Sequence, residues 1–145
     1  MAPVRFIAEV FRRLRNRSSS EAPHIRLGRE GEDIAARHLR RSGYKVLRRN
    51  FRAPHGGEVD IVCRHGRELV FVEVKTRSSE EFGRPFDAVD QKKRRLIIRG
   101  AMKWLRLLDM PDITFRFDVV EVLTAPPGEV RIIENAFQLP DNYSY

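Results

Sequence analysis

Residues 69–75 read Leu-Val-Phe-Val-Glu-Val-Lys, and this stretch decides how the rest of the chain can fold. Five of its seven residues are apolar, which predicts a central β-strand covered on both faces of its sheet. Glu73 and Lys75 stand two residues apart, so both side chains project from the same face of that strand. An unpaired ion buried there costs several kcal/mol, so each of the two predicts a partner, a metal ion or access to water.

A second pair of acids precedes this strand along the chain. The segment from Glu58 to Cys63 predicts a strand whose two carboxylates share one face, while its apolar residues line the other. If the turn to the central strand closes symmetrically about residues 65–66, Glu58 lies opposite Glu73, and Asp60 lies diagonal to Glu73. In that register all of these acids face the side of Lys75, whereas a shift of one residue would separate them.

Three carboxylates gathered in this way repel one another. Two unit charges about 5 Å apart cost about 3 kcal/mol at an effective dielectric of 20. Lys75 supplies one compensating charge, whereas Mg²⁺ or Mn²⁺ supplies two and prefers oxygen ligands, which makes Asp60, Glu73 and Glu58 candidate metal ligands. A divalent ion there suits phosphodiester hydrolysis, with Lys75 acting on the nucleophile and steadying the developing negative charge. The alternative is a salt-bridge ladder between Lys75 and the acids on a solvated sheet face.

The rest of the chain predicts an α/β fold around this strand. Apolar residues at helical spacing predict a helix over residues 28–42 and a second helix after the central strand, capped by Asp87 or Asp90. The order is α-β-β-β-α-β-β, so short turns imply antiparallel pairs and the long helix implies a parallel crossover within one mixed sheet. The strand-like runs cover residues 44–51, 58–63, 69–76, 113–123 and 130–134.

The balance of charge favours a polyanionic partner. The 145 residues contain 28 Lys and Arg against 20 Asp and Glu, a formal net charge of +8. Seven of the basic residues fall between positions 88 and 106, where Asp90 is the only acid. This segment predicts a phosphate-binding surface, and the alternative is a solvated helix face that keeps the protein soluble.

The first 27 residues predict a separate arm. Residues 4–15 have the pattern of a short basic amphipathic helix, and a serine-rich linker follows, so the domain itself is expected over residues 28–145. The chain has one cysteine, Cys63, and no apolar run long enough to span a bilayer. We therefore expect a cytoplasmic protein without a disulfide or a transmembrane segment.

Several motifs resemble the YraN family of small bacterial proteins. They are residues 31–36 (Gly-Glu-Asp-Ile-Ala-Ala), residues 57–60 (Gly-Glu-Val-Asp), residues 71–77 (Phe-Val-Glu-Val-Lys-Thr-Arg) and Lys92-Lys93. The family is similar to the PD-(D/E)xK nuclease superfamily, with the restriction-endonuclease-like core of archaeal Holliday-junction resolvases. The resemblance covers roughly residues 28–123.

The resemblance implies roles for individual residues. Asp60 and Glu73 would bind the metal, Lys75 would be the catalytic lysine, and Glu32 would match the helix-one glutamate of the resolvase-like branch. From spacing alone, Glu32 is equally well an ordinary acid favoured by the helix dipole. The expected nucleic-acid-binding residues are Gln91, Lys92, Lys93, Arg94, Arg95 and Arg77.

Together these features predict a Mg²⁺- or Mn²⁺-dependent endonuclease-like protein that acts on DNA, including branched or single-stranded forms. Resolution of a two-fold junction would need two active sites and hence a homodimer. The alternatives are a non-catalytic nucleic-acid-binding module and an adaptor in DNA recombination or uptake.

Overall fold

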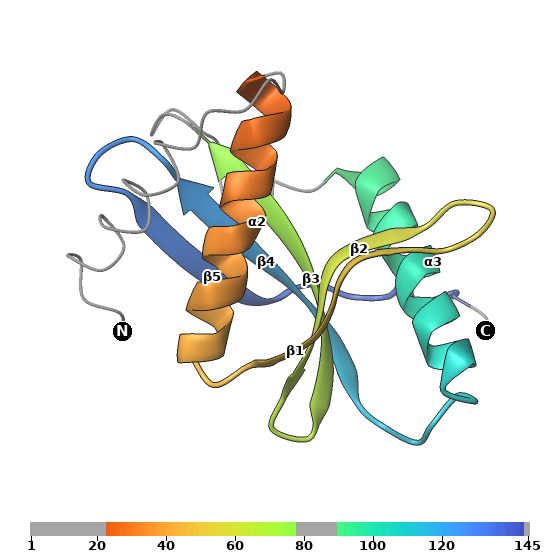
Figure 1. Cartoon of the computed structure of the whole chain (residues 1–145). Coiled ribbons are helices and arrows are strands. Elements are labelled where there is room, and N and C mark those ends of the chain that lie inside the picture. The colour runs from red at the N-terminus through yellow and green to blue at the C-terminus, as the bar shows by residue number, and fades with distance from the viewer. Residues whose placement is uncertain (1–22, 78–89, 144–145) are drawn as a thin grey trace.

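A mixed five-stranded sheet forms the centre of the fold in the computed structural model, which describes residues 23–77 and 90–143 (Figure 1). The strands lie in the order β1-β2-β3-β4-β5. Only β3 and β4 are parallel, and the other neighbouring pairs are antiparallel. The strands are β1 (Lys45–Arg52), β2 (Glu58–His65), β3 (Glu68–Arg77), β4 (Phe115–Leu123) and β5 (Glu129–Phe137).

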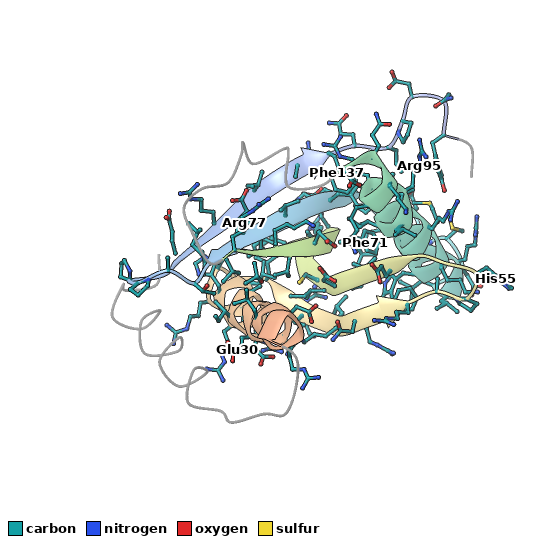
Figure 2. The ribbon with its side chains drawn as sticks, turned by 90° about the horizontal axis from the view of Figure 1, so that it is seen from above. Glu30, His55, Phe71, Arg77, Arg95 and Phe137 are labelled. Atoms are coloured by element: carbon teal, nitrogen blue, oxygen red, sulfur yellow. The ribbon has the colours of Figure 1, made fainter. Side chains whose placement is uncertain are left out.

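Two helices cover opposite faces of this sheet. The first, α2 (Pro23–Arg41), packs on one face with a core that includes Leu39 and Val72, and α3 (Gln91–Leu107) packs on the other with a core that includes Phe71 (Figures 1 and 2). The central strand β3 is therefore covered on both sides, as its apolar run predicts. The α/β class, the element order and the restriction-endonuclease-like arrangement are all confirmed.

The boundaries of the two helices refine the expectations. The first helix begins at Pro23 rather than near residue 28, so the segment expected as a linker is partly helical. Proline is well suited to a first helical turn, because the N–H that it lacks would have no partner there. Asp90 is the N-cap of α3, and its side chain accepts a hydrogen bond of 2.8 Å from the backbone N–H of Lys93. Residues 4–15 and the other proposed cap, Asp87, lie outside the described residues.

The hairpin between β2 and β3 has a different register from the one expected. Phe71 pairs with Val62 and His65 pairs with Glu68, so the turn consists of Gly66 and Arg67. Gly66 has a φ of 61°, a conformation typical of tight two-residue hairpin turns. The prediction that Glu58 lies opposite Glu73 is therefore wrong by two residues. An even shift keeps every side chain on its predicted face.

Two glycines allow the helices to approach the sheet closely. A Cβ on Gly31 of α2 would clash with Thr76 Oγ1 on β3. A Cβ on Gly57, directly before β2, would lie 2.8 Å from the backbone nitrogen of Gly100 on α3. The first contact holds α2 against β3, and the second holds the residue before β2 against the middle of α3.

We expect Gly57→Ala to lower the free energy of unfolding by about 2 kcal/mol or more. The added methyl group meets backbone rather than a mobile side chain, and Gly57 has a φ of 113°, where other residues are strained. Urea unfolding of the two proteins measures the difference. Gly43→Ala is a matched control, because Gly43 also has a positive φ but has open space around its Cβ position. Equal losses in both variants would contradict the close packing of α3 on β2.

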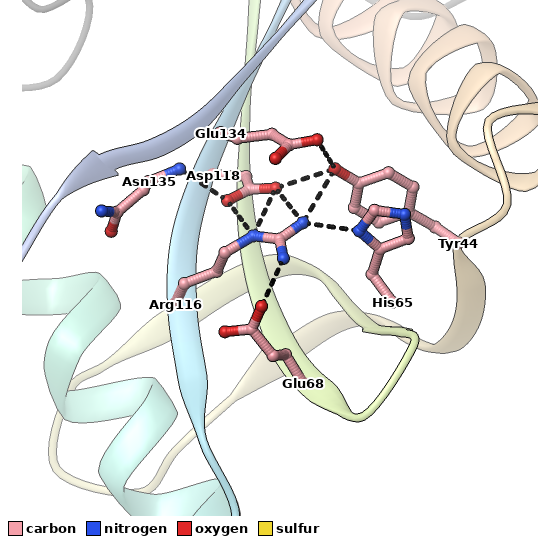
Figure 3. Close-up of polar contacts among 7 residues, drawn as sticks. All are labelled: Tyr44, His65, Glu68, Arg116, Asp118, Glu134 and Asn135. Atoms are coloured by element: carbon pink, nitrogen blue, oxygen red, sulfur yellow. Dashed lines mark hydrogen bonds and ion pairs between the residues drawn. The ribbon is translucent and has the colours of Figure 1, made fainter.

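A buried polar cluster closes the end of the sheet where β3 begins (Figure 3). Arg116 donates hydrogen bonds to Asp118, Glu68 and the Tyr44 hydroxyl, and its Nη2 lies 2.8 Å from His65 Nδ1. Asp118 is completely buried. Because His65 lies on β2, Glu68 on β3 and Tyr44 directly before β1, Arg116 on β4 joins three neighbouring strands and the residue that leads into the fourth.

Within the part of the chain that the structure describes, no helix is long and apolar enough to cross a membrane. Cys63 is buried, and burial raises the pKa of its thiol to about 12. At neutral pH this thiol is protonated, so it is not a nucleophile.

Candidate active site

The first two residues of the candidate site are Asp60 on β2 and Glu73 on β3. Ile61 on β2 pairs with Val72 on β3. Asp60 comes directly before Ile61 and Glu73 directly after Val72, so the two acids occupy the next positions on these antiparallel strands, one residue farther from the turn. Asp60 Oδ2 accepts a hydrogen bond of 2.8 Å from the backbone N–H of Val74. Glu73 is 3% exposed, and its Oε2 has no hydrogen-bond partner among the described residues. The structure thus brings together the two acids that the sequence places on one face.

Two ammonium groups lie near the buried carboxylate. Lys75 Nζ is 4.0 Å from Glu73 Oε1, and Lys93 Nζ, from the first turn of α3, is 3.6 Å from the same oxygen. Lys93 also forms an ion pair with Glu58. Glu58, expected as a third metal ligand, is thus paired with a lysine, and that pairing lowers the pKa of Glu58.

Glu32 on α2 borders the site from the other side of the sheet. It follows Gly31, whose contact with Thr76 holds this turn of α2 against β3. Burial raises the pKa of Glu32, and the negative charge of Asp60 adds to this effect, while Arg49 opposes it. Asp60 is therefore within electrostatic reach of both Glu32 and Glu73. A pocket of about 640 Å³ opens beside Glu32 and is lined by Gly28, Arg29, Glu32, Asp33, Arg49, Asn50 and Arg52.

The electrostatics of Glu73 are those of a carboxylate that lacks sufficient positive charge. Burial is the largest cause that raises its pKa and the negative charge of Asp60 adds to it, while Lys93 and Lys75 lower it, and the net result is a pKa of about 8. Burial opposes the charged form of Lys93, but its hydrogen bond to Glu58 and the charge of Glu73 outweigh burial and raise the pKa of Lys93. Two neighbouring lysines therefore do not fully compensate the acids.

This raised pKa makes the stability of the protein depend on pH. The folded protein holds a proton on Glu73 more tightly than the unfolded chain does. The resulting contribution to the free energy of unfolding is fully present below the ordinary pKa of a glutamate and is lost as pH rises toward 8. In a chelating buffer we expect the unfolding free energy to fall between pH 5 and pH 8 by a few kcal/mol more in the wild type than in Glu73→Gln. Urea unfolding at several pH values measures this, and parallel curves for the two proteins would contradict it.

The acid pair fits a hard divalent cation. Carboxylate oxygens are the ligands that Mg²⁺ prefers, and Mg²⁺ is commonly held by one or two carboxylates, with water and substrate phosphates completing its shell. The unpartnered Glu73 Oε2 beside Asp60 leaves such an oxygen available. Among the described residues, no group of three or more His, Cys, Asp or Glu side chains is arranged to hold a metal ion. A metal at this site would therefore depend on Asp60 and Glu73.

The expected nucleic-acid-binding residues occupy different positions. Gln91, Lys92 and Arg95 are exposed on the first turns of α3, and Arg94 lies over the Phe137 ring at 5.4 Å (Figure 2 labels Arg95 and Phe137). Lys93 faces the acids. Arg77 ends β3 and is half-buried.

Sequence reasoning missed a further buried acid near the site. Glu121 on β4 pairs in register with Lys75 and is 2% exposed, and neither of its carboxylate oxygens has a hydrogen-bond partner in the part of the chain that the structure describes. The signal was present, because Glu121 stands in Val-Val-Glu-Val-Leu, an apolar run like the one around Glu73. Its place beside Lys75 depends on the parallel register of β3 and β4, which no local pattern determines.

Comparison with known proteins places the chain among close relatives. A UPF0102 protein of Geobacter sulfurreducens is 49% identical over 115 residues, which cover 78% of this chain and 89% of the relative. A UPF0102 protein of a Parafrankia species is 50% identical over 107 residues, which cover 74% of this chain and 90% of the relative. The family described as "Uncharacterised protein family UPF0102" matches residues 31–122. This range contains Glu32, Asp60, Glu73 and Lys75, and the resemblance to the YraN family is confirmed. The chain belongs to the UPF0102 family.

Proposed function

We propose that this protein is a divalent-metal-dependent endonuclease that hydrolyses phosphodiester bonds of DNA at Asp60 and Glu73. The observation that carries the proposal is the buried Glu73 carboxylate, which has an adjacent acid, a lysine on the same strand face and one oxygen without a hydrogen-bond partner in the described ranges. A buried acid of this kind is costly to keep in a fold without a ligand. Acids whose pKa is shifted by burial and by a specific charged neighbour are typical of functional sites.

Each side chain of the acid pair and its neighbours would have a separate role in hydrolysis. Asp60 and Glu73 would hold the ion, and the hydrogen bond from the Val74 N–H fixes the orientation of Asp60. When bound, Mg²⁺ or Mn²⁺ supplies charge that polarises the phosphoryl group and lowers the pKa of water. Lys75 is close enough to Glu73 to hold the attacking water or to stabilise negative charge on the phosphate. Glu32, within electrostatic reach of Asp60, borders the same site.

The basic composition supports a DNA substrate. The chain carries a formal net charge of +8, and all seven charged residues of α3 are basic. Such a distribution favours a polyanion and would hold its backbone beside the acid pair.

A second candidate function is a nucleic-acid-binding module without catalysis, and the position of Lys93 favours it. Its ammonium group is 3.6 Å from Glu73 Oε1, so the protein itself places a cation beside the acid pair. In this case the acids and the two lysines form an internal charge network, and DNA binds through α3 alone.

A cleavage panel distinguishes the two functions. Purified full-length protein is incubated with duplex, flap, four-way junction and single-stranded DNA, with Mg²⁺, with Mn²⁺ or with EDTA. The nuclease cleaves at least one of these forms in the presence of metal and none in EDTA. Binding to DNA without cleavage in any metal would support the non-catalytic module. An Asp60→Asn preparation purified in parallel controls for contaminating nuclease.

A further inference from the structure

A straight row of positive charge runs the length of α3. Its members follow one another at intervals of three, four, four and three residues, which places them on one stripe of the helix. Fourteen residues of α-helix span about 21 Å. The basic stripe consists of Lys92, Arg95, Arg99, Lys103 and Arg106.

The charges of the basic stripe have no counter-charges among residues 23–77 and 90–143. The helix carries no acidic residue, and none of the five side chains forms an ion pair or a hydrogen bond with any residue in the described ranges. Four of the five are exposed, and Lys103 is half-buried. Like charges three or four residues apart destabilise a helix. Repulsion among the five positive charges therefore destabilises the helix, and a bound polyanion would offset this repulsion.

The far end of the stripe opens into a pocket of about 380 Å³. Arg99, Lys103 and Arg106 line one side, and the turn between β1 and β2 supplies His55 and Gly56 on the other. No acidic residue is among the residues that line this pocket. The contact of Gly57 with Gly100 holds the turn against α3, and Figure 2 shows His55 at this end of the molecule. The pocket suits a phosphate group, because arginine side chains can donate paired hydrogen bonds to it.

The near end of the stripe adjoins the candidate active site. Lys92 is followed directly by Lys93, whose ammonium contacts Glu58 and Glu73. One rigid helix therefore connects the acid pair to the pocket. A ligand that contacts both must be an extended polyanion.

We propose that the basic stripe docks one arm of a nucleic-acid duplex, with a backbone phosphate in the pocket at Arg99, Lys103 and Arg106. This inference rests on the proposed function, because it takes the acid pair as the cleavage site. At 3.4 Å per base pair, the 21 Å stripe matches about six base pairs of B-form DNA. The single aromatic residue of α3, Trp104, packs edge-on against Phe51 in the core. The five residues of the basic stripe thus include no aromatic ring on which single-stranded bases could stack.

Fluorescence anisotropy of labelled DNA of about 18 base pairs tests the proposal in EDTA, where cleavage plays no part. The test variant is the triple substitution Arg99→Ala, Lys103→Ala and Arg106→Ala. The matched control is Arg37→Ala, Lys45→Ala and Arg64→Ala, which removes the same charge from exposed sites elsewhere. We expect the test variant to bind at least about tenfold more weakly than the control. The slope of log K against log salt is expected to be smaller in magnitude by about 2.7 in the test variant than in the wild type, because three phosphate contacts are lost. Circular dichroism establishes that both variants are folded.

Each alternative has its own outcome. Equal affinity of the two triple variants would overturn the proposal. So would a single strand that binds as tightly as the duplex and loses as much affinity in the test variant. Displacement of the duplex by inorganic phosphate at constant ionic strength would show a small-anion pocket instead. Because none of these measurements requires cleavage, a wild type that binds as expected but never cleaves DNA would leave this inference standing and refute the proposed nuclease.

Discussion

Replacing Glu73 with glutamine is expected to reduce DNA cleavage at least about 10³-fold while leaving DNA binding unchanged or slightly tighter. Glutamine keeps the size of the side chain but removes the charge that would hold the metal. Loss of several kcal/mol of charge stabilisation corresponds to a rate effect of this size. Removal of a negative charge cannot weaken attraction for phosphate. Single-turnover cleavage and anisotropy of the same DNA measure the two effects separately.

Glu129→Gln is the matched control for this experiment. Glu129 is an exposed glutamate at the start of β5 that pairs with Arg131, away from the acid pair in sequence and strand order. We expect it to cleave at the wild-type rate. Undiminished cleavage by Glu73→Gln, in a preparation free of other nucleases, would refute the catalytic role of this acid.

Replacing Asp118 with alanine is expected to lower the free energy of unfolding by about 3 to 5 kcal/mol. Asp118 accepts hydrogen bonds from Arg116 at 3.0 Å, from the Tyr44 hydroxyl at 3.1 Å and from the backbone N–H of Asn135 at 3.0 Å. Its loss leaves the Arg116 guanidinium, 11% exposed, without its main counter-charge. Removing one partner of a buried ion pair typically costs this much. A domain of this size has a total stability of only about 5 to 15 kcal/mol.

Thermal and urea unfolding measure the effect of Asp118→Ala. Glu134→Ala provides the control, because Glu134 is exposed and lies at the edge of the same cluster, 3.4 Å from the Tyr44 hydroxyl. We expect the control to lose less than about 1 kcal/mol. Similar losses in the two variants would show that the cluster does not stabilise the junction of the strands.

The shared face of the acids was predictable from the sequence, whereas their register was not. Alternation along a strand is a fixed property of the backbone, so Glu73 and Lys75 had to lie on one face, and Asp60 had to share the face of Glu58. The pairing depends on which residues form the turn. Gly66 adopts the positive φ that a two-residue turn needs, and the resulting pairing moves every residue by two.

Contacts between elements that are distant in the chain could not be predicted from the sequence. Lys93 was assigned to nucleic acid because it stands in a basic run, yet the approach of α3 to β2 turns it toward Glu58 and Glu73. The network of Arg116 joins β2, β3 and β4 with the residue before β1, and it has no local signature except charges within an apolar run. Periodicity indicates which face a residue occupies but not which element packs there.

Binding of Mn²⁺ to the full-length protein in the absence of DNA tests the acid pair most directly. Mn²⁺ is titrated into wild type, Asp60→Asn and Glu129→Gln in separate experiments, and electron paramagnetic resonance measures the free Mn²⁺ that remains. We expect one bound ion per chain in the wild type and in Glu129→Gln, and at least about tenfold weaker binding in Asp60→Asn. Equal binding by all three proteins, or none by the wild type at millimolar Mn²⁺, would contradict a metal site at Asp60 and Glu73.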